Sequence, residues 1–421
     1  MLQTIDGRYR QYSCCSHDFT SGAGCFAAWA NILRSGLQYM PFTIPDLVQS
    51  DRFQWFEVSS AVQDGLTIRK FRMSALLSIA TAVPGHRITQ SDVLGVLAKA
   101  RGAALPARLE QILGNSGIDQ RYLACEADYY LEPRSWTSRA AIYDRVGTRL
   151  TQNAAGDALE KAGLAPSDID AIVLISTTGT MTPSIPSRMI EAMGFDQATQ
   201  TIPVFGHGCA GGVLGLRLAN DLAAANGGQN VLLIALELCS LSYDYSQFDK
   251  KNMIATALFA DGCAAAVISG KAGQGDAPAF RAFDQKTWPD TRDMMGWEIG
   301  ATGFDLVLAR DIPTFVTKDF APFCDTFLEE QELDKSDLGE PACHPGGGRV
   351  VEALEEYFAP EIAGIPATRD ILRQHGNMSS PTVLFVLENL LQKKPDKQIL
   401  LTALGPGFTA ALGILDPQGV A

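Results

Sequence analysis

The chain has 421 residues, 46% of them hydrophobic, which is enough for two or three domains with sizeable cores. A net charge of −13 without a lysine- or arginine-rich run argues against a nucleic-acid partner or an anionic membrane surface. No apolar stretch reaches the about 18 to 20 residues that span a bilayer, so we expect no transmembrane segment. The nine cysteines form no Cys-x-x-Cys pair or metal-binding spacing, and without a signal peptide they predict a cytoplasmic protein.

Residues 1–72 differ from the rest of the chain. They hold three of the nine cysteines and show no sustained period of 2 or 3.6 residues, so we treat them as an atypical N-terminal extension. Met73 then opens an apolar strand, and the pattern is regular from there on. We expect Met73 to be the biological start, with residues 1–72 as upstream sequence; the alternative is a genuine extension.

From Met73 onward, predicted strands and helices alternate. In residues 73–270 we expect a strand from 74, helices at 91–116, 136–162 and 187–193, and strands at 168–176, 201–205, 230–236 and 263–269. Residues 271–279 read as a linker. In residues 271–421 we expect helices within 311–333 and at 348–357 and 380–391, and strands ending near 344 and at 398–404 and 408–415. This alternation predicts an α/β fold, and the similar order of the two halves suggests an internal duplication.

Cys209 lies where the predicted strand 201–205 meets a predicted helix that runs from Val213 to about residue 225. A cysteine at such a helix start is exposed to free backbone N–H groups and to the helix dipole, which both favour the thiolate. The surrounding glycines, in Gly-Cys-Ala-Gly-Gly (208–212), would let a thioester approach backbone amides. We therefore interpret Cys209 as a nucleophile; the alternative is a small buried cysteine in a glycine-rich turn.

Two motifs in the second half supply complementary groups. His344 opens His-Pro-Gly-Gly (344–347), and Asn377 lies in Gly-Asn-Met-Ser-Ser (376–380) just before a predicted helix. An imidazole can stabilise a thiolate, and neutral imidazole and carboxamide donors can hold a carbonyl or enolate oxygen. Taken singly, His344 could be a loop histidine and Asn377 a helix cap. Together with Cys209 they favour catalysis.

A fourth motif, Gly-Pro-Gly-Phe-Thr (405–409), completes a set that resembles, in the same order, the signature stretches of the chalcone synthase-like, or type III, polyketide synthases. The similarity runs from about residue 73 to 415. The resemblance implies the thiolase fold, a duplicated α/β core of five αβαβα layers, and a homodimer. It also implies that acyl-CoA and malonyl-CoA are the substrates and that no metal or other cofactor is needed.

In this family the cysteine takes an acyl starter from CoA, and the histidine and asparagine hold the malonyl carbonyl while carbon dioxide leaves. The resemblance assigns these roles to Cys209, His344 and Asn377. Repeated condensation lengthens a chain that finally cyclises. The segment Glu-Leu-Cys-Ser (237–240) is similar to bacterial members, many of which use long fatty acyl starters and release alkylpyrones or alkylresorcinols.

The resemblance also implies further substrate-binding residues. Phe304 looks like the family's aromatic gatekeeper of the acyl tunnel; the alternative is an ordinary core phenylalanine. The segment with Thr177, Thr178 and Thr182 would line the pocket and meet the partner subunit. The loop of Gly405, Pro406 and Gly407 would border the cyclisation cavity, unless it is only a buried glycine hairpin.

The basic residues that plant members use for the CoA phosphates are mostly missing. Only Arg108 matches, while Gln111 and Asn115 occupy the other positions. The phosphate contacts could come from Arg101 or Arg121 instead, or the starter could arrive on an acyl carrier protein.

Two rival families share the residue types. An initiating β-ketoacyl-acyl-carrier-protein synthase also has the thiolase fold with Cys, His and Asn, but it typically has Gln-Ala-Asn after its histidine. Papain-like proteases share the order Cys, His, Asn, but their Cys-Gly-(Ser/Ala)-Cys-(Trp/Tyr) context is absent. The carrier-protein synthase is therefore the alternative that we retain.

Overall fold

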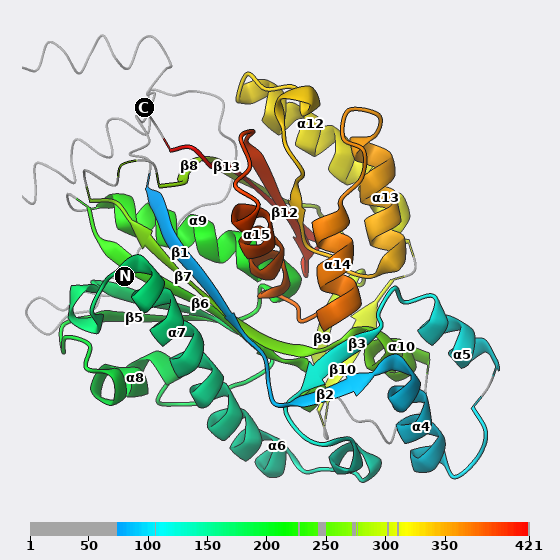
Figure 1. Ribbon diagram of the computed structural model, residues 1–421. Coiled ribbons are helices and arrows are strands. Elements are labelled where there is room, and N and C mark those ends of the chain that lie inside the picture. Colours follow the sequence, from blue (N-terminus) through cyan, green and yellow to red (C-terminus); the bar gives the residue numbers. More distant parts are fainter. Residues whose placement is uncertain are drawn as a thin grey trace, which may run out of the picture. The chain divides into compact units, whose positions relative to one another are not determined.

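The computed structural model (Figure 1) describes residues 74–419 apart from 106, 226–227, 243–249, 272–274, 276, 301–302 and 310. The extension expected over residues 1–72 lies outside the described residues. Those that are described belong to one compact unit, Phe71–Ala421. No helix in this part of the chain is both long and apolar enough to cross a membrane.

In the described part of the chain, nine strands form the central sheet, in two halves. The order is β11-β12-β13-β8-β1-β7-β6-β4-β5. The first half consists of β1 (Ala75–Ala82), β4 (Ala171–Ile175), β5 (Gln200–Val204), β6 (Asn230–Leu238) and β7 (Asp261–Ser269). The second consists of β8 (Ala279–Thr287), β11 (Ala342–Cys343), β12 (Ile399–Gly405) and β13 (Thr409–Asp416). A single pair, Ala75 with Ala279, joins β1 to β8.

The two halves repeat one pairing pattern. The first strand of each half, β1 or β8, pairs antiparallel with the last strand, β7 or β13. That strand pairs antiparallel with the one before it in the chain, β6 or β12. The latter in turn pairs parallel with β4 or β11. The internal duplication suggested by the order of predicted elements is therefore present in the sheet.

Both faces of the sheet are covered by helices. In β6, Val231 and Leu233 pack into one hydrophobic cluster and Leu232 and Ile234 into another. A strand buried on both faces is continuously apolar, which is why the sequence marks β6 so clearly. The middle layer, visible near the centre of Figure 1, consists of α9 (Gly211–Ala224) and α15 (Thr382–Gln392), which contact each other and strands of both halves.

The outer layers complete the αβαβα arrangement. The helices α7 (Thr148–Ala162) and α8 (Ile185–Met193) cover the first half, and α12 (Ala321–Glu330) and α13 (Gly348–Phe358) cover the second. Gly163 ends α7 in a left-handed conformation, with φ of 66°, as the sequence predicts. Two further helices are α6 (Trp136–Ile142) and α14 (Pro366–His375).

A group of smaller elements forms the walls of the site. It comprises α4 (Gln90–Arg101), α5 (Ala107–Gly114), α10 (Lys250–Leu258), α11 (Ile312–Phe315), the pair β2 (His86–Thr89) and β3 (Gln120–Leu123), and the hairpin β9 (Met295–Ile299) and β10 (Phe304–Leu308). The single helix expected at 91–116 is divided, because Gly102 caps α4 in a left-handed conformation with φ of 65°. The sequence did not predict α14 or either strand pair.

Candidate active site

Cys209 lies in a short 3-10 helix, Gly208–Ala210, between β5 and α9. Its side chain is only 5% exposed. Gly208 has a φ of +48°, and a Cβ there would lie 2.7 Å from Cδ of Pro406, so only glycine fits without movement. The Gly208 N–H donates to Oγ1 of Thr177 at 3.0 Å. The turn that presents Cys209 is thus fixed from both sides.

Burial dominates the electrostatics of the thiol. It raises the pKa of Cys209 to about 12, and the charge of Glu237 acts in the same direction, while hydrogen bonds from Ser379 and Asn377 lower it. The thiol is therefore protonated in the resting protein at neutral pH. Burial therefore opposes the thiolate that the position before a helix was expected to favour, and α9 itself begins only at Gly211.

Asn377 is held in place by its backbone and its carboxamide. Its backbone N–H donates to the Leu258 carbonyl at 2.9 Å, and its own carbonyl accepts from the Ala260 N–H at 2.8 Å. Its Nδ2 donates to the Gly346 carbonyl at 3.2 Å, and its Oδ1 accepts from the Ser379 N–H at 2.8 Å. Asn377 does not cap the following helix, since α15 begins only at Thr382. A carboxamide so oriented presents Nδ2 toward Cys209 as well.

His344 follows β11, where its backbone N–H donates to the Thr402 carbonyl at 2.8 Å. The side chain is 4% exposed, and neither ring nitrogen has a hydrogen-bond partner among the described residues. Burial lowers the pKa of His344 to about 3, so the imidazole is neutral at physiological pH. Buried polar atoms in folded proteins are almost always paired, so both nitrogens are available to a ligand.

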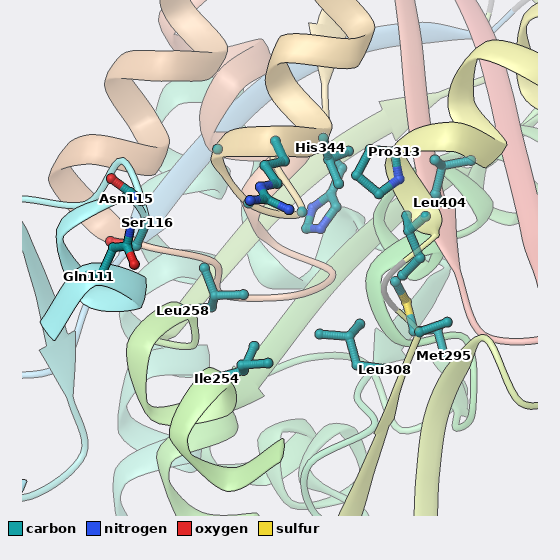
Figure 2. Close-up of a pocket in the computed structure, with 17 residues that line it drawn as sticks. Gln111, Asn115, Ser116, Ile254, Leu258, Met295, Leu308, Pro313, His344 and Leu404 are labelled. Carbon is teal, nitrogen blue, oxygen red and sulfur yellow. The ribbon is translucent and has the colours of Figure 1, made fainter. Parts of the chain in front are cut away.

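Two adjoining cavities bring these residues together. The outer cavity, of about 450 Å³, is lined by His344 and, at one side, by Gln111, Asn115 and Ser116 (Figure 2). The inner chamber, of about 40 Å³, is lined by Cys209 and Asn377. Both are lined by the same four residues, Leu258, Met295, Leu308 and Gly346. Cys209 and Asn377 thus line one cavity and His344 the cavity beside it, although the three residues come from both halves of the chain.

Glu237 is a site residue that the sequence analysis missed. Its carboxylate accepts hydrogen bonds from the N–H groups of Thr177 and Thr178, from the Thr178 hydroxyl at 2.7 Å and from the Ser380 hydroxyl at 3.0 Å. Burial raises the pKa of Glu237 to about 7 despite these bonds. The only charged residue in the apolar run of β6 was the available signal. The Glu237 carboxylate thereby joins the loop of Thr177 and Thr178 to Ser380, which follows Asn377 in the chain.

The predicted substrate-binding threonines occupy different environments. Thr177 and Thr178 are buried, and their polar groups form hydrogen bonds with Glu237 and with the Cys209 turn. Thr182 is exposed and lines neither cavity. Thr177 and Thr178 therefore hold the Cys209 turn in place and line neither cavity.

The loop 405–407 lies directly beside the cysteine turn. A Cβ on Gly405 would lie 2.6 Å from the backbone nitrogen of Ala210, so the close approach of the two segments requires glycine. Pro406 lines the inner chamber. Gly407 follows it with a φ of +133°.

Phe304 lies behind the chamber wall. It is 4% exposed, its ring contacts Trp136 and Trp297, and it is not among the residues that line either cavity. The wall itself contains Trp297, Phe259 and Leu306, the last of which lies two residues beyond Phe304 on the same strand face. Trp297 and Leu306 therefore line the chamber, and Phe304, where the gatekeeper was expected, does not.

The three arginines considered as contacts to the CoA phosphates lie in different environments. Arg108 lies in α5, but its side chain is outside the described residues. Arg101 is exposed at the end of α4. Arg121 is 1% exposed and donates to the carbonyls of Thr256, Ala257 and Phe259 at 2.7 to 2.9 Å. It caps the end of α10 and is not available to a CoA phosphate.

Arg121→Gln is therefore expected to lower the free energy of unfolding by about 3 kcal/mol, because several buried carbonyls lose a charged donor. Urea unfolding measures this change. The KM for CoA thioesters of the folded fraction should stay close to that of the native protein. A stable variant with a raised KM would contradict the structural role.

Known proteins resemble the whole described region. Residues 67–272 match the family model for the N-terminal domain of chalcone and stilbene synthases, and residues 280–415 match that for the C-terminal domain. A 1,3,6,8-tetrahydroxynaphthalene synthase from Streptomyces peucetius subsp. caesius is 34% identical, covering 82% of this chain and 93% of that protein. A putative chalcone synthase from Bacillus subtilis is 31% identical, covering 81% and 98%.

The solved structure of 1,3,6,8-tetrahydroxynaphthalene synthase from Streptomyces coelicolor A3(2), a bacterial type III polyketide synthase, matches with a TM-score of 0.77. The sequences are 29% identical, and the match covers 82% of this chain and all of that one. The predicted thiolase fold is thereby confirmed. The protein belongs to the chalcone and stilbene synthase family, the type III polyketide synthases.

Proposed function

We propose that the protein loads an acyl starter from CoA onto Cys209, extends it by repeated decarboxylative condensation with malonyl-CoA, and releases the chain by cyclisation. The observation that carries the proposal is the arrangement around the two cavities. A buried thiol and a fixed carboxamide line the inner chamber, and a neutral imidazole with no hydrogen-bond partner among the described residues lines the adjoining outer cavity. These are the groups that acyl transfer and enolate formation require.

In the loading step, the sulfur of Cys209 attacks the thioester carbonyl and the bond to the CoA sulfur breaks. The thiol begins protonated, so its proton must leave as the new bond forms. The neutral imidazole of His344 relays this proton to the departing CoA sulfur as the new bond forms. The products are an acyl-cysteine and free CoA thiol.

In the extension step, the bond between the malonyl carboxylate and the methylene carbon breaks and carbon dioxide leaves. The electron pair moves to the thioester carbonyl, whose oxygen becomes an enolate. His344 and Asn377 donate N–H groups to that oxygen. Because both donors are neutral, they stabilise mainly the negative charge that develops on the oxygen during the reaction. The enolate carbon then attacks the carbonyl of the acyl-cysteine, and the Cys209 sulfur leaves as a thiolate that takes a proton from solvent. The lengthened chain is now on CoA and returns to Cys209 by a second loading step before the next extension.

The inner chamber favours a short acyl starter. Its volume is about 40 Å³, and Phe259 and Trp297 wall it with rings whose centroids are 5.8 Å apart. The tetrahydroxynaphthalene synthases among the relatives are named for an aromatic product without an alkyl chain. A long fatty starter with an alkylpyrone or alkylresorcinol product, as expected from the sequence, is the alternative.

Incubation of the full chain with radiolabelled malonyl-CoA and acyl-CoA starters from acetyl to stearoyl, followed by mass analysis, tests the proposal. Products that contain several malonyl units are expected. A single condensation that occurs only with an acyl carrier protein would instead indicate the initiating β-ketoacyl-acyl-carrier-protein synthase. No condensation with any starter would refute the proposed function.

Trp297→Gly is expected to shift starter preference toward longer chains, because it removes the largest side chain of the chamber wall. We expect the kcat/KM for octanoyl-CoA to rise about tenfold relative to that for acetyl-CoA. Trp297→Phe, which keeps an aromatic wall, should change the ratio much less. Trp288→Ala serves as the matched control, since Trp288 lines neither cavity. An unchanged ratio in Trp297→Gly would show that another part of the cavity selects the starter.

A further inference from the structure

The loop 405–408 contributes to the wall of the inner chamber and is held from behind by the turn that follows β8. Pro406 lines the chamber, and Phe408, two residues later, is fully buried. The Phe408 backbone is bonded to the turn through both of its polar groups. Its carbonyl accepts from the Trp288 N–H at 3.1 Å, and its N–H donates to Oγ1 of Thr291 at 2.6 Å. The position of the loop therefore depends on this turn.

Thr291 links the same turn to a second part of the wall. Its hydroxyl also donates to the Trp288 carbonyl at 2.7 Å, a contact to the backbone that any residue at position 288 would keep. Its own carbonyl accepts from the Met294 N–H at 3.0 Å, just before β9. Met295, the first residue of β9, lines both cavities (Figure 2). One residue thus connects two segments that line the chamber of Cys209.

Thr291 lines neither cavity, so it acts on a bound substrate only through the segments that it holds. This place requires a hydroxyl, because the group donates one hydrogen bond and accepts another. A valine has nearly the same shape but would leave the buried Phe408 N–H without its acceptor. The loop would then shift, and Pro406 in this loop lies against Gly208, the residue before Cys209.

We propose that Thr291 is a positioning residue that sets how far the polyketide chain grows before it is released. This inference rests on the proposed function and adds to it a residue outside both cavities. The segments of Pro406 and Met295 flank the space in which the growing chain lies beside Cys209. Held in place, they keep the chain extended. Once released, they give it room to curl into a ring.

The reaction that this arrangement suppresses is an early lactonisation. In a chain with two extensions, the enol oxygen of the far carbonyl can attack the thioester carbonyl of the same chain. The carbon–oxygen bond forms, the carbon–sulfur bond breaks, and the enol proton goes to the departing sulfur. The product is a six-membered lactone, and no further extension is possible.

The products of the full-length chain test the proposal, with radiolabelled malonyl-CoA and acyl-CoA starters from acetyl to stearoyl. The measured quantity is the ratio of the two-extension lactone to all longer products. We expect Thr291→Val to raise this ratio about tenfold. Thr291→Ser keeps the hydroxyl and should leave the ratio close to the native value. The rate at which the starter acylates Cys209 should change little in either variant, because Thr291 touches neither the thiol nor His344.

Thr326→Val is the matched control. The Thr326 hydroxyl also donates to a backbone carbonyl, that of Pro322 at 2.9 Å, but this residue lies on α12 and lines neither cavity. It should keep the native ratio. A native ratio in Thr291→Val, an equal shift in Thr291→Ser, or a native protein that itself releases mainly the two-extension lactone would overturn the positioning role and leave the proposed function intact. Absence of condensation with every starter in the native protein would instead refute the proposed function.

Hydrogen exchange in the native protein gives a second test, which does not depend on the folding of a variant. The Phe408 amide should exchange slowly, because it is buried and bonded to Thr291. Mass spectrometry of overlapping peptides that end on either side of Phe408 measures this exchange. An amide that exchanges as fast as one in an unfolded chain would overturn the contact through which Thr291 acts.

Discussion

Replacement of Cys209 by alanine is expected to abolish polyketide formation, with a loss in kcat of roughly four orders of magnitude or more. The reason is that alanine offers no atom to carry the acyl chain between condensations. The side chain is buried and small, so its truncation should cost only about 1 kcal/mol of stability. Product formation from labelled malonyl-CoA measures the loss, and peptide mass spectrometry locates the acyl adduct in the native protein.

Cys239→Ala is the matched control for this prediction. Cys239 is also fully buried, yet it lines neither the outer cavity nor the inner chamber. Its replacement should leave both the adduct and the products in place. An acyl adduct on another cysteine, or multi-malonyl products from Cys209→Ala, would contradict the role of Cys209.

The buried core of the fold was predictable from sequence because its strands are apolar on both faces. β6 and β12 were recognised for this reason, and the glycine-rich motifs placed Cys209 and His344 at strand ends. The motifs also single out Cys209, His344 and Asn377, which line two adjoining cavities. Motif order identifies such residues even though 168 positions separate Cys209 from Asn377.

The walls of the site were much less predictable. The hairpin β9–β10 is only partly buried and has no strong alternation, so neither it nor the position of Trp297 could be read from the pattern. Arg121 shows a related limit. A positive charge in a short strand reads as a surface residue, and only the three-dimensional structure reveals that it caps α10.

The ionisation of Cys209 could not be derived from local sequence either. Proximity to a helix start is visible in the chain, but burial depends on the packing of distant segments such as those of Ser379 and Pro406. Burial raises the pKa of the Cys209 thiol to about 12 and lowers the pKa of the His344 imidazole to about 3. Both shifts favour the neutral pair, so proton transfer must accompany the arrival of substrate.

His344→Ala and Asn377→Ala are each expected to slow malonyl-CoA decarboxylation by about a hundredfold to a thousandfold, because each removes one donor to the enolate oxygen. Release of labelled carbon dioxide measures this step directly. The double variant should lose less than the product of the two factors, since the two donors hold one oxygen. Acylation of Cys209 by the starter should persist in Asn377→Ala, which separates extension from loading.

The pH profile gives an independent test of how His344 acts. Its pKa lies well below the usual value, so the imidazole stays neutral as the pH falls from about 8 to about 5 and remains the same N–H donor throughout. Decarboxylation by the native protein should therefore show no acid limb with a pKa near 6.5. His344→Gln, which keeps a neutral N–H donor, should retain more activity than His344→Ala.

An acid limb near 6.5 that disappears in His344→Gln would instead mean that His344 titrates in the working enzyme, and the neutral-donor mechanism would be wrong. A flat profile with equal losses in the alanine and glutamine variants would leave the neutral state intact but show that glutamine does not reproduce the N–H donation of His344.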